Sequence, residues 1–190
     1  MNNPADTLAA YDYQFPEALI AQEPARPRDS ARLLVYDRET NETTLDTFAH
    51  IDEYLPERSV VVFNETKVIP ARMGVSVDGK EIDVLCLKQD GDLLRVMAPR
   101  AVQPGMVLAW AGHTLECVER DGKEAILKPS FPIDRTVPLL EEFGKTPLPP
   151  YIEAATMDER ERRAEYQTVF AKNLGSVAAP TASLHFTPEL

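Results

Sequence analysis

Four two-residue turns that end in glycine divide the middle of this chain into short segments. They are Asp78-Gly79, Asp90-Gly91, Ala111-Gly112 and Asp121-Gly122. An Asp-Gly pair supplies the positive φ that a tight hairpin needs, so such turns are typical of adjacent antiparallel strands. Between the turns, apolar residues recur at every second position, as at Ile82, Val84 and Cys86. The segment from Gly74 to Lys128 is therefore predicted to form about six short strands in a small barrel or sandwich.

The sequence on both sides of this segment mixes helical and strand patterns. The pattern changes near Arg72 and again near Phe131, which indicates an insertion into a larger domain. We therefore predict a mixed α+β protein. Residues 1–72 and 135–190 are expected to form parts of a large α/β domain, and residues 73–134 an inserted antiparallel β-barrel domain.

Several local elements are predicted in the flanking parts. Short helices are expected at 16–20 and 51–55, a hairpin of strands at 33–37 and 43–47, a buried strand at 60–63, a helix at 137–143, and a second helix from a Thr156–Glu159 capping box to about Lys172. The prolines of the segment PLPPYI, residues 147–152, predict an extended and rigid connector between the two helices.

The composition is that of a folded and acidic protein. Hydrophobic residues make up 44% of the chain and the formal net charge is -11, so an RNA partner would be repelled unless basic side chains gather on one face. The N-terminus shows neither a signal peptide nor a membrane helix, so we expect a cytoplasmic protein with no membrane partner. Cys86 and Cys117 stand far apart, which predicts two small core residues rather than a disulfide or a metal site.

Common cofactor and catalytic motifs are absent from the sequence. All eight glycines are isolated, so there is no GxGxxG motif and no P-loop, and neither HExxH nor GxSxG occurs. A nucleoside would therefore have to be held by side chains and irregular backbone rather than by a glycine turn at a helix N-terminus.

Two segments carry candidate functional residues. In VVFNETKVIPAR, residues 61–72, an apolar run leads into Asn64, whose amide could bind a base or ribose, and Arg72 could hold a carboxylate or phosphate. The alternative is an Asx turn with solvated cations. Near the other end, His185 is the best candidate for a general acid or base, because its ordinary pKa lies near neutrality. The alternatives for His185 are a structural histidine and a hydrolase that pairs it with Ser183, although no nucleophile elbow is visible.

Six segments together resemble one family in their order along the chain. They are PEALIAQEP (16–24), RDSARLLV (28–35), VVFNETKVIPAR (61–72), PLPPYI (147–152), YQTVFA (166–171) and AAPTASLHFT (178–187). With these segments the sequence resembles the S-adenosylmethionine:tRNA ribosyltransferase-isomerase family from Tyr13 to Thr187.

The resemblance implies a function and a set of site residues. The implied reaction transfers and isomerises the ribosyl part of S-adenosylmethionine onto 7-aminomethyl-7-deazaguanine in tRNA, giving epoxyqueuosine and releasing adenine and methionine. It implies an inserted β-barrel. We expect no metal cofactor and a monomer. His185 is the candidate base. The candidate binding residues are Asn64, Thr66, Arg72, Tyr166, Gln167 and Thr181, and Tyr166 could also face the sulfonium by cation–π attraction.

The chain departs from the family pattern in two ways. Ser183 stands where the family has a glycine, which would be costly if the backbone there needed a positive φ. Family chains also continue well beyond this segment, so we expect the large α/β domain to be incomplete here. The alternative function is a non-catalytic module, derived from the family, that binds RNA or protein.

Overall fold

The computed structural model describes residues 11–153 and 156–190. Its strands are β1 (Arg32–Tyr36), β2 (Thr43–Thr47), β3 (Thr66–Val68), β4 (Arg72–Val77), β5 (Lys80–Asp90), β6 (Leu93–Met97), β7 (Val107–Trp110), β8 (His113–Asp121), β9 (Glu124–Pro129) and β10 (Asn173–Ser176). Its α-helices are α1 (Thr136–Phe143) and α2 (Glu159–Glu165), and 3₁₀ helices cover Glu17–Leu19, Arg28–Ser30, Phe48–Tyr54, Ile133–Arg135 and Thr181–His185.

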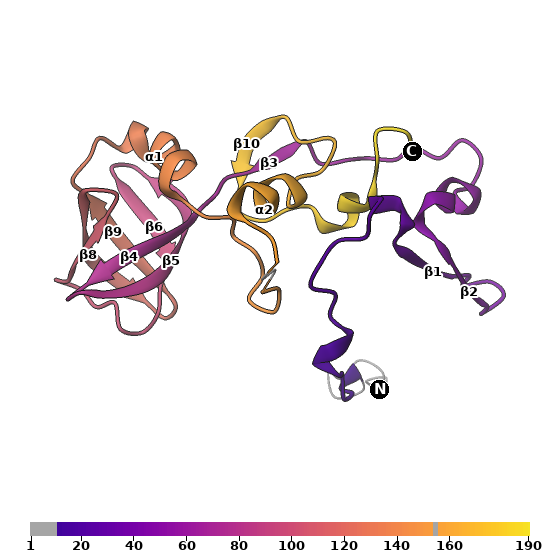
Figure 1. The fold of residues 1–190 in the computed structure, drawn as a ribbon, viewed down its shortest axis with the longest axis horizontal. Helices are drawn as coiled ribbons and strands as arrows, with labels where there is room; N and C mark the ends of the chain where they lie inside the picture. Colours follow the sequence, from indigo (N-terminus) through magenta and orange to yellow (C-terminus); the bar gives the residue numbers. More distant parts are fainter. Residues whose placement is uncertain (1–10, 154–155) are drawn as a thin grey trace, which may run out of the picture.

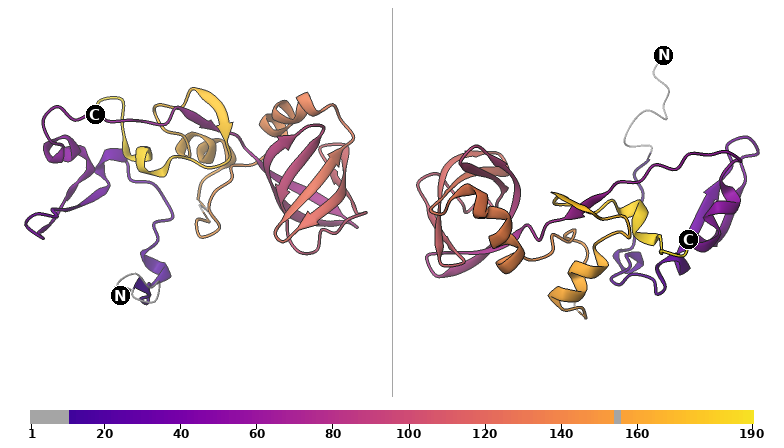
Figure 2. Two further views of the ribbon diagram at one scale, coloured as in Figure 1. Left: turned by 180° about the vertical axis from the view of Figure 1, so that it is seen from behind. Right: turned by 90° about the horizontal axis from the view of Figure 1, so that it is seen from above.

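These elements form three groups that follow one another along the longest axis of the molecule (Figure 1). Strands β4 to β9 and helix α1 form one end, and the β1–β2 hairpin forms the other. Between them lie α2 and the parallel pair of β3 and β10. Figure 2 shows the same separation from behind and from above. The middle group combines residues that are about 100 positions apart in the sequence.

The predicted barrel is confirmed. Its six strands run antiparallel to their neighbours in the order β4-β5-β6-β9-β8-β7, and a pairing of Ser76 with Ala109 closes the barrel between β4 and β7. Two of the predicted turns have positive φ at both central residues, as type I′ hairpins require: 49° and 77° at Asp78-Gly79, and 50° and 77° at Ala111-Gly112. Local turn geometry therefore specifies the hairpins, whereas the pairings of β6 with β9 and of β4 with β7 join strands that are not neighbours in the sequence.

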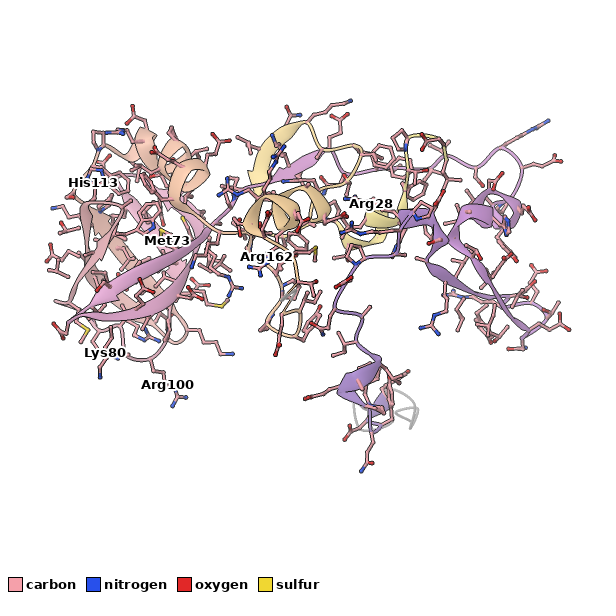
Figure 3. The ribbon with its side chains drawn as sticks, in the orientation of Figure 1. Arg28, Met73, Lys80, Arg100, His113 and Arg162 are labelled. Carbon is pink, nitrogen blue, oxygen red and sulfur yellow. The ribbon has the colours of Figure 1, made fainter. Side chains whose placement is uncertain are left out.

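The interior of the barrel holds the main hydrophobic core. Every second side chain points inward, so Met73, Val75, Leu94, Leu108, Leu115 and Leu127 are all completely buried. Met73 is labelled inside the barrel in Figure 3. Cys86 and Cys117 are buried there as free thiols, and burial raises the pKa of Cys86 to about 11. Both cysteines thus behave as the small core residues that the sequence predicted.

The N-terminal hairpin is confirmed, but the strand predicted at 60–63 is wrong. Strands β1 and β2 pair antiparallel around a turn in which Asn41 has a φ of 58°. Val60 and Val62 are 88% and 87% exposed and belong to no strand. Among the described residues this run has no strand beside it, so its backbone cannot complete a ladder. Only Phe63 packs inward, against Phe170 at 4.1 Å between ring centroids.

Of the two longer helices predicted from the sequence, the first agrees with the structure and the second differs in its length and its cap. Helix α1 ends at Gly144, as expected. Helix α2 is shorter than predicted, and its capping box is formed by Asp158 and Glu161 rather than by Thr156 and Glu159. Each carboxylate accepts a hydrogen bond from the other residue's backbone N–H, at 2.8 and 3.0 Å.

Where helix α2 ends, at Glu165, an arginine from a distant segment binds its last carbonyls. The Arg28 guanidinium donates to the carbonyls of Ala164 and Gln167 and to both the carbonyl and the carboxylate of Glu165. A side-chain cation at the C-terminus satisfies carbonyls that have no partner within the helix. The chain then turns into the extended path that leads to β10.

The division into domains remains a proposal. We keep the boundaries of 1–72 with 135–190 and of 73–134, since the barrel strands run from Arg72 to Pro129. None of the helices in the described ranges has the length and apolar character needed to cross a bilayer.

Candidate functional site

A cavity of about 1190 Å³ lies between the hairpin group and the middle group. Its walls come from residues 21–34, from the β1–β2 hairpin, from the connector 148–152, from α2, and from the 3₁₀ helix Thr181–His185. Leu33, Leu34 and Leu45 supply an apolar wall, and charged side chains of both signs also line the cavity: Glu23, Asp46, Glu165, Arg28, Arg32 and Arg162. Small-molecule sites combine apolar walls with polar groups that fix the orientation of the ligand.

The predicted base lies at this cavity. The 3₁₀ helix Thr181–His185 begins after Pro180, whose carbonyl accepts a hydrogen bond from Ser183 at 3.0 Å, and it presents both Thr181 and His185 to the cavity. The His185 side chain is exposed, and no group in the described part of the chain hydrogen-bonds its imidazole. A solvent-accessible ring with both nitrogens available can exchange protons with a bound ligand.

Four phenylalanines hold this 3₁₀ helix in place. Phe186 packs edge-on against Phe48 and Phe63 at 5.0 and 4.9 Å, and against Phe170 at 5.8 Å between ring centroids. The His185 ring lies 5.2 Å from Phe48. Aromatic pairs at these separations are favourable beyond the area that they bury. His185 therefore stands on a packed aromatic base although its own ring is accessible.

Ser183 fits the backbone without strain. It lies inside the 3₁₀ helix and is not among the four described non-glycine residues that have a positive φ. The glycine of the family pattern is therefore not required here for backbone conformation.

Two polar side chains hold the opposite walls of the cavity together. Arg28 connects the first wall to the end of α2 through the four contacts described above. Gln22 connects the same wall to the connector, because its amide donates to the carbonyl of Tyr151 at 3.1 Å and accepts from the N–H of Glu153 at 2.8 Å. Figure 3 shows Arg28 and Arg162 in this region. Neither Arg28 nor Gln22 was predicted as a site residue, although each lies in one of the six segments that resemble the family.

The other predicted binding residues lie outside the large cavity, except Tyr166. Tyr166 is buried and lines it. The amide of Gln167 donates to and accepts from the backbone of Val68, both at 2.9 Å, and thus acts as a strand partner. Arg72 donates to the carbonyl of Leu148 at 2.7 Å and lies 3.6 Å from Asp83. These two side chains fix the walls.

The remaining two predicted residues stand at the start of β3. The Asn64 side chain accepts from the N–H of Thr66 at 2.8 Å, which is the Asx turn considered as an alternative. Thr66 pairs with Asn173 in the parallel ladder of β3 and β10. A role for either residue in binding stays a prediction.

A polar cluster at the edge of the cavity is sensitive to pH. Asp46 accepts hydrogen bonds from Tyr54 at 2.6 Å, from Thr47 at 2.7 Å and from His50 at 2.8 Å. The hydrogen bonds from Tyr54 and His50 lower the pKa of Asp46 from 3.8 to about 2. Asp46 in turn raises the pKa of His50 above its ordinary 6.5.

The directions of the two pKa shifts predict the pH range in which the His50–Asp46 pair stabilises the fold. The contribution of His50 is complete below pH 6.5 and is lost as the pH rises through its folded pKa, whereas that of Asp46 is complete above pH 3.8 and is lost towards pH 2. An NMR titration should give His50 a midpoint above 6.5, and Asp46→Asn should return it towards that value. The control is Asp52→Asn, because Asp52 makes the smallest contribution to the raised pKa of His50. This variant should leave the His50 midpoint almost unchanged. Equal midpoints in all three proteins would contradict the assignment.

Comparison with known proteins identifies the family. The family model described as "Queuosine biosynthesis protein" matches residues 8–190. The chain belongs to this queuosine biosynthesis family. The match includes all three groups of the fold and every residue predicted for the site.

Two curated relatives align with 95% of the chain. Both are named S-adenosylmethionine:tRNA ribosyltransferase-isomerase: one from Nitratiruptor sp. is 38% identical and one from Sulfurimonas denitrificans is 37% identical. The chain spans only 55% of the length of each relative. A solved structure, S-adenosylmethionine tRNA ribosyltransferase from Thermotoga maritima, is 28% identical, with 94% of this chain and 51% of that one covered and a TM-score of 0.35.

Within residues 11–153 and 156–190, histidine, cysteine and carboxylate side chains do not gather in a group of three or more that could hold an ion.

Proposed function

We propose that this chain acts in queuosine biosynthesis as an S-adenosylmethionine-dependent tRNA ribosyltransferase-isomerase. It would move the ribosyl part of S-adenosylmethionine onto 7-aminomethyl-7-deazaguanine in tRNA, release adenine and methionine, and form epoxyqueuosine. The names of the relatives support this proposal. The structural observation that carries it is the convergence of His185, Thr181 and Tyr166 on one cavity of about 1190 Å³.

The cavity has the size and chemistry for a nucleoside with a charged tail. Sites for small molecules commonly measure about 300–1,000 Å³, so this cavity has room for S-adenosylmethionine beside part of a second substrate. The apolar wall at Leu34 and Leu45 suits a purine. Arg32 is a potential partner for the carboxylate of the methionine part, because its side chain lines the cavity, is exposed and carries five N–H donors in a planar fork. Arg28 already binds Glu165 and the end of α2, so it shapes the wall instead.

His185 is proposed as the base that removes a proton near the sulfonium-activated 5′ carbon. Its ring is exposed and lines the cavity, and an imidazole is the side chain that most often serves as a general base. The Thr181 hydroxyl would steady a developing oxyanion or epoxide oxygen. The ring of Tyr166 would face the sulfonium. For Gln167, Arg72, Asn64 and Thr66 we propose an indirect role in shaping the walls, since each already has a partner in the chain.

One assay tests the proposed function. The chain is incubated with S-adenosylmethionine and tRNA that carries the aminomethyl base, and free adenine and the epoxide-modified nucleoside are measured. The proposal predicts both products in equal amounts. If tRNA binds without either product, the chain is instead the non-catalytic binding module, which its span of about half the relatives' length makes the natural alternative. The monomeric state and the cytoplasmic location remain predictions.

A further inference from the structure

A second cavity lies beside Tyr166. It measures about 360 Å³ and is formed by β3, β10, the end of α1 with the following Thr146-Pro147, and α2. Tyr166 is buried and lines both cavities, so the two cavities share this residue. The proposed reaction gives this second cavity no role.

The charge of this second cavity is opposite to that of the chain. Lys67, Arg160 and Arg163 line it together with a single carboxylate, that of Glu141. The whole chain has 20 lysine and arginine residues against 31 aspartate and glutamate residues. Basic side chains are therefore concentrated here in a protein that is otherwise strongly acidic, and such a concentration attracts anions locally.

Arg163 is the fixed member of this group. Its guanidinium donates to the carboxylate of Glu159 at 3.0 Å, to the carbonyl of Glu141 at 2.7 Å and to the carbonyl of Gly144. These bonds use three of its five N–H donors and hold it between α1 and α2. Since Glu159 neutralises its charge, Arg163 is best suited to build the wall.

Lys67 and Arg160 are the accessible members. Both side chains are exposed, and within the described residues neither has an ion pair or a hydrogen bond. They come from different elements, Lys67 from β3 and Arg160 from α2. Arg160 stands three positions before Arg163 and so lies on the same face of the helix. Two unpaired cations thus reach one cavity from two sides of the fold.

We propose that the 360 Å³ cavity binds a phosphate group of the RNA backbone through Lys67 and Arg160. This inference rests on the proposed function, because it assigns to that function the contact surface for its tRNA. Lysine and arginine side chains bind phosphate oxygens without reading sequence, so they position an RNA rather than select a base. A phosphate held in this cavity would bring a neighbouring nucleotide towards the large cavity that shares Tyr166 with it. The net charge of -11 does not prevent this contact, because the cations are gathered at one place.

The test measures how strongly tRNA binding to the full chain depends on salt. Lys67→Ala and Arg160→Ala should each weaken tRNA binding about three- to tenfold at 0.1 M salt and lower the slope of log K against log salt by about 1. Lys80→Ala is the matched control, since Lys80 is exposed at the start of β5 in the barrel and lies outside this cavity (Figure 3). It should bind tRNA as the unchanged chain does. Calorimetry with S-adenosylmethionine should give the same affinity for all four proteins.

Other results would overturn the inference. One is that Lys67→Ala and Arg160→Ala bind tRNA with the affinity and salt slope of the unchanged chain. The other is that these variants lose affinity for S-adenosylmethionine instead, which would show that the cavity binds the carboxylate of that molecule. Failure of the proposed function looks different: adenine release would be absent while tRNA binding still depended on both cations.

Discussion

His185→Ala is expected to lower the rate of adenine release by about 10²- to 10⁴-fold, the usual contribution of a positioned general base. The unfolding transition should hardly change. The exposed imidazole has no hydrogen bond within the described residues, and its main packing contact is the ring of Phe48 at 5.2 Å. Rates come from the adenine assay under single-turnover conditions, and stability comes from urea unfolding of the same preparations.

The control for this variant is another histidine of the same chain. His113 lies on the barrel, 5.2 Å from the ring of Phe131, and lines neither cavity. His113→Ala should therefore release adenine at the unchanged rate. A His185→Ala protein that is folded and as fast as the unchanged chain would show that the base is another group.

Gly144→Ala is expected to destabilise the protein by about 3 kcal/mol or more, at the upper end of the usual effect of overpacking. A β-carbon at this position would overlap the carbonyl oxygens of Pro70 and Leu140. Neither oxygen can rotate away, because both belong to the backbone. Since Gly144 has a φ of -75°, the cause is lack of space rather than backbone strain. Thermal unfolding should show a melting temperature lower by roughly 6–12 °C.

Gly74→Ala provides the comparison. A β-carbon there would lie 3.8 Å from the amine of Lys145 and 4.0 Å from the carboxylate of Asp83, which is ordinary contact. The substitution should leave stability unchanged or raise it slightly, because a glycine inside a strand costs about 0.5–1 kcal/mol relative to alanine. Equal stabilities for the two variants would mean that the end of α1 does not pack against Pro70 as described.

The barrel could be predicted because its information is local. Each hairpin is specified by a turn of two residues and by alternation in the strands beside it, so four of the six strand pairings join neighbours in the sequence. The other two pairings, β6 with β9 and β4 with β7, close the barrel over longer range. The buried positions of Val84 and Cys86 follow from the same alternation. The hairpin of β1 and β2 was predictable for the same reason.

The cavity walls could not be predicted, because long-range contacts make them. Arg28 reaches carbonyls 136 to 139 positions away, at the end of α2, where helical periodicity alone predicts a longer helix. Gln167 pairs with the backbone of Val68, 99 positions away. The exposed valines at 60 and 62 show the converse: an apolar run predicts a strand only where a partner strand lies beside it.

The site residues were found only in part. His185, Thr181 and Tyr166 converge on the large cavity, but the roles of Gln22 and Arg28 depend on contacts across the chain that their types do not indicate. Lys67 and Arg160 gave no signal either, because their significance depends on sharing a cavity.

Binding of S-adenosylmethionine to the large cavity is the central claim, and histidine NMR tests it most directly. The chain has three histidines, so the ring signals of His50, His113 and His185 can be assigned by substitution. Titration with S-adenosylmethionine should shift the His185 signals with a saturable one-site dependence and leave those of His113 on the barrel unmoved. Saturable binding that leaves His185 unshifted, or no binding at all, would contradict the account.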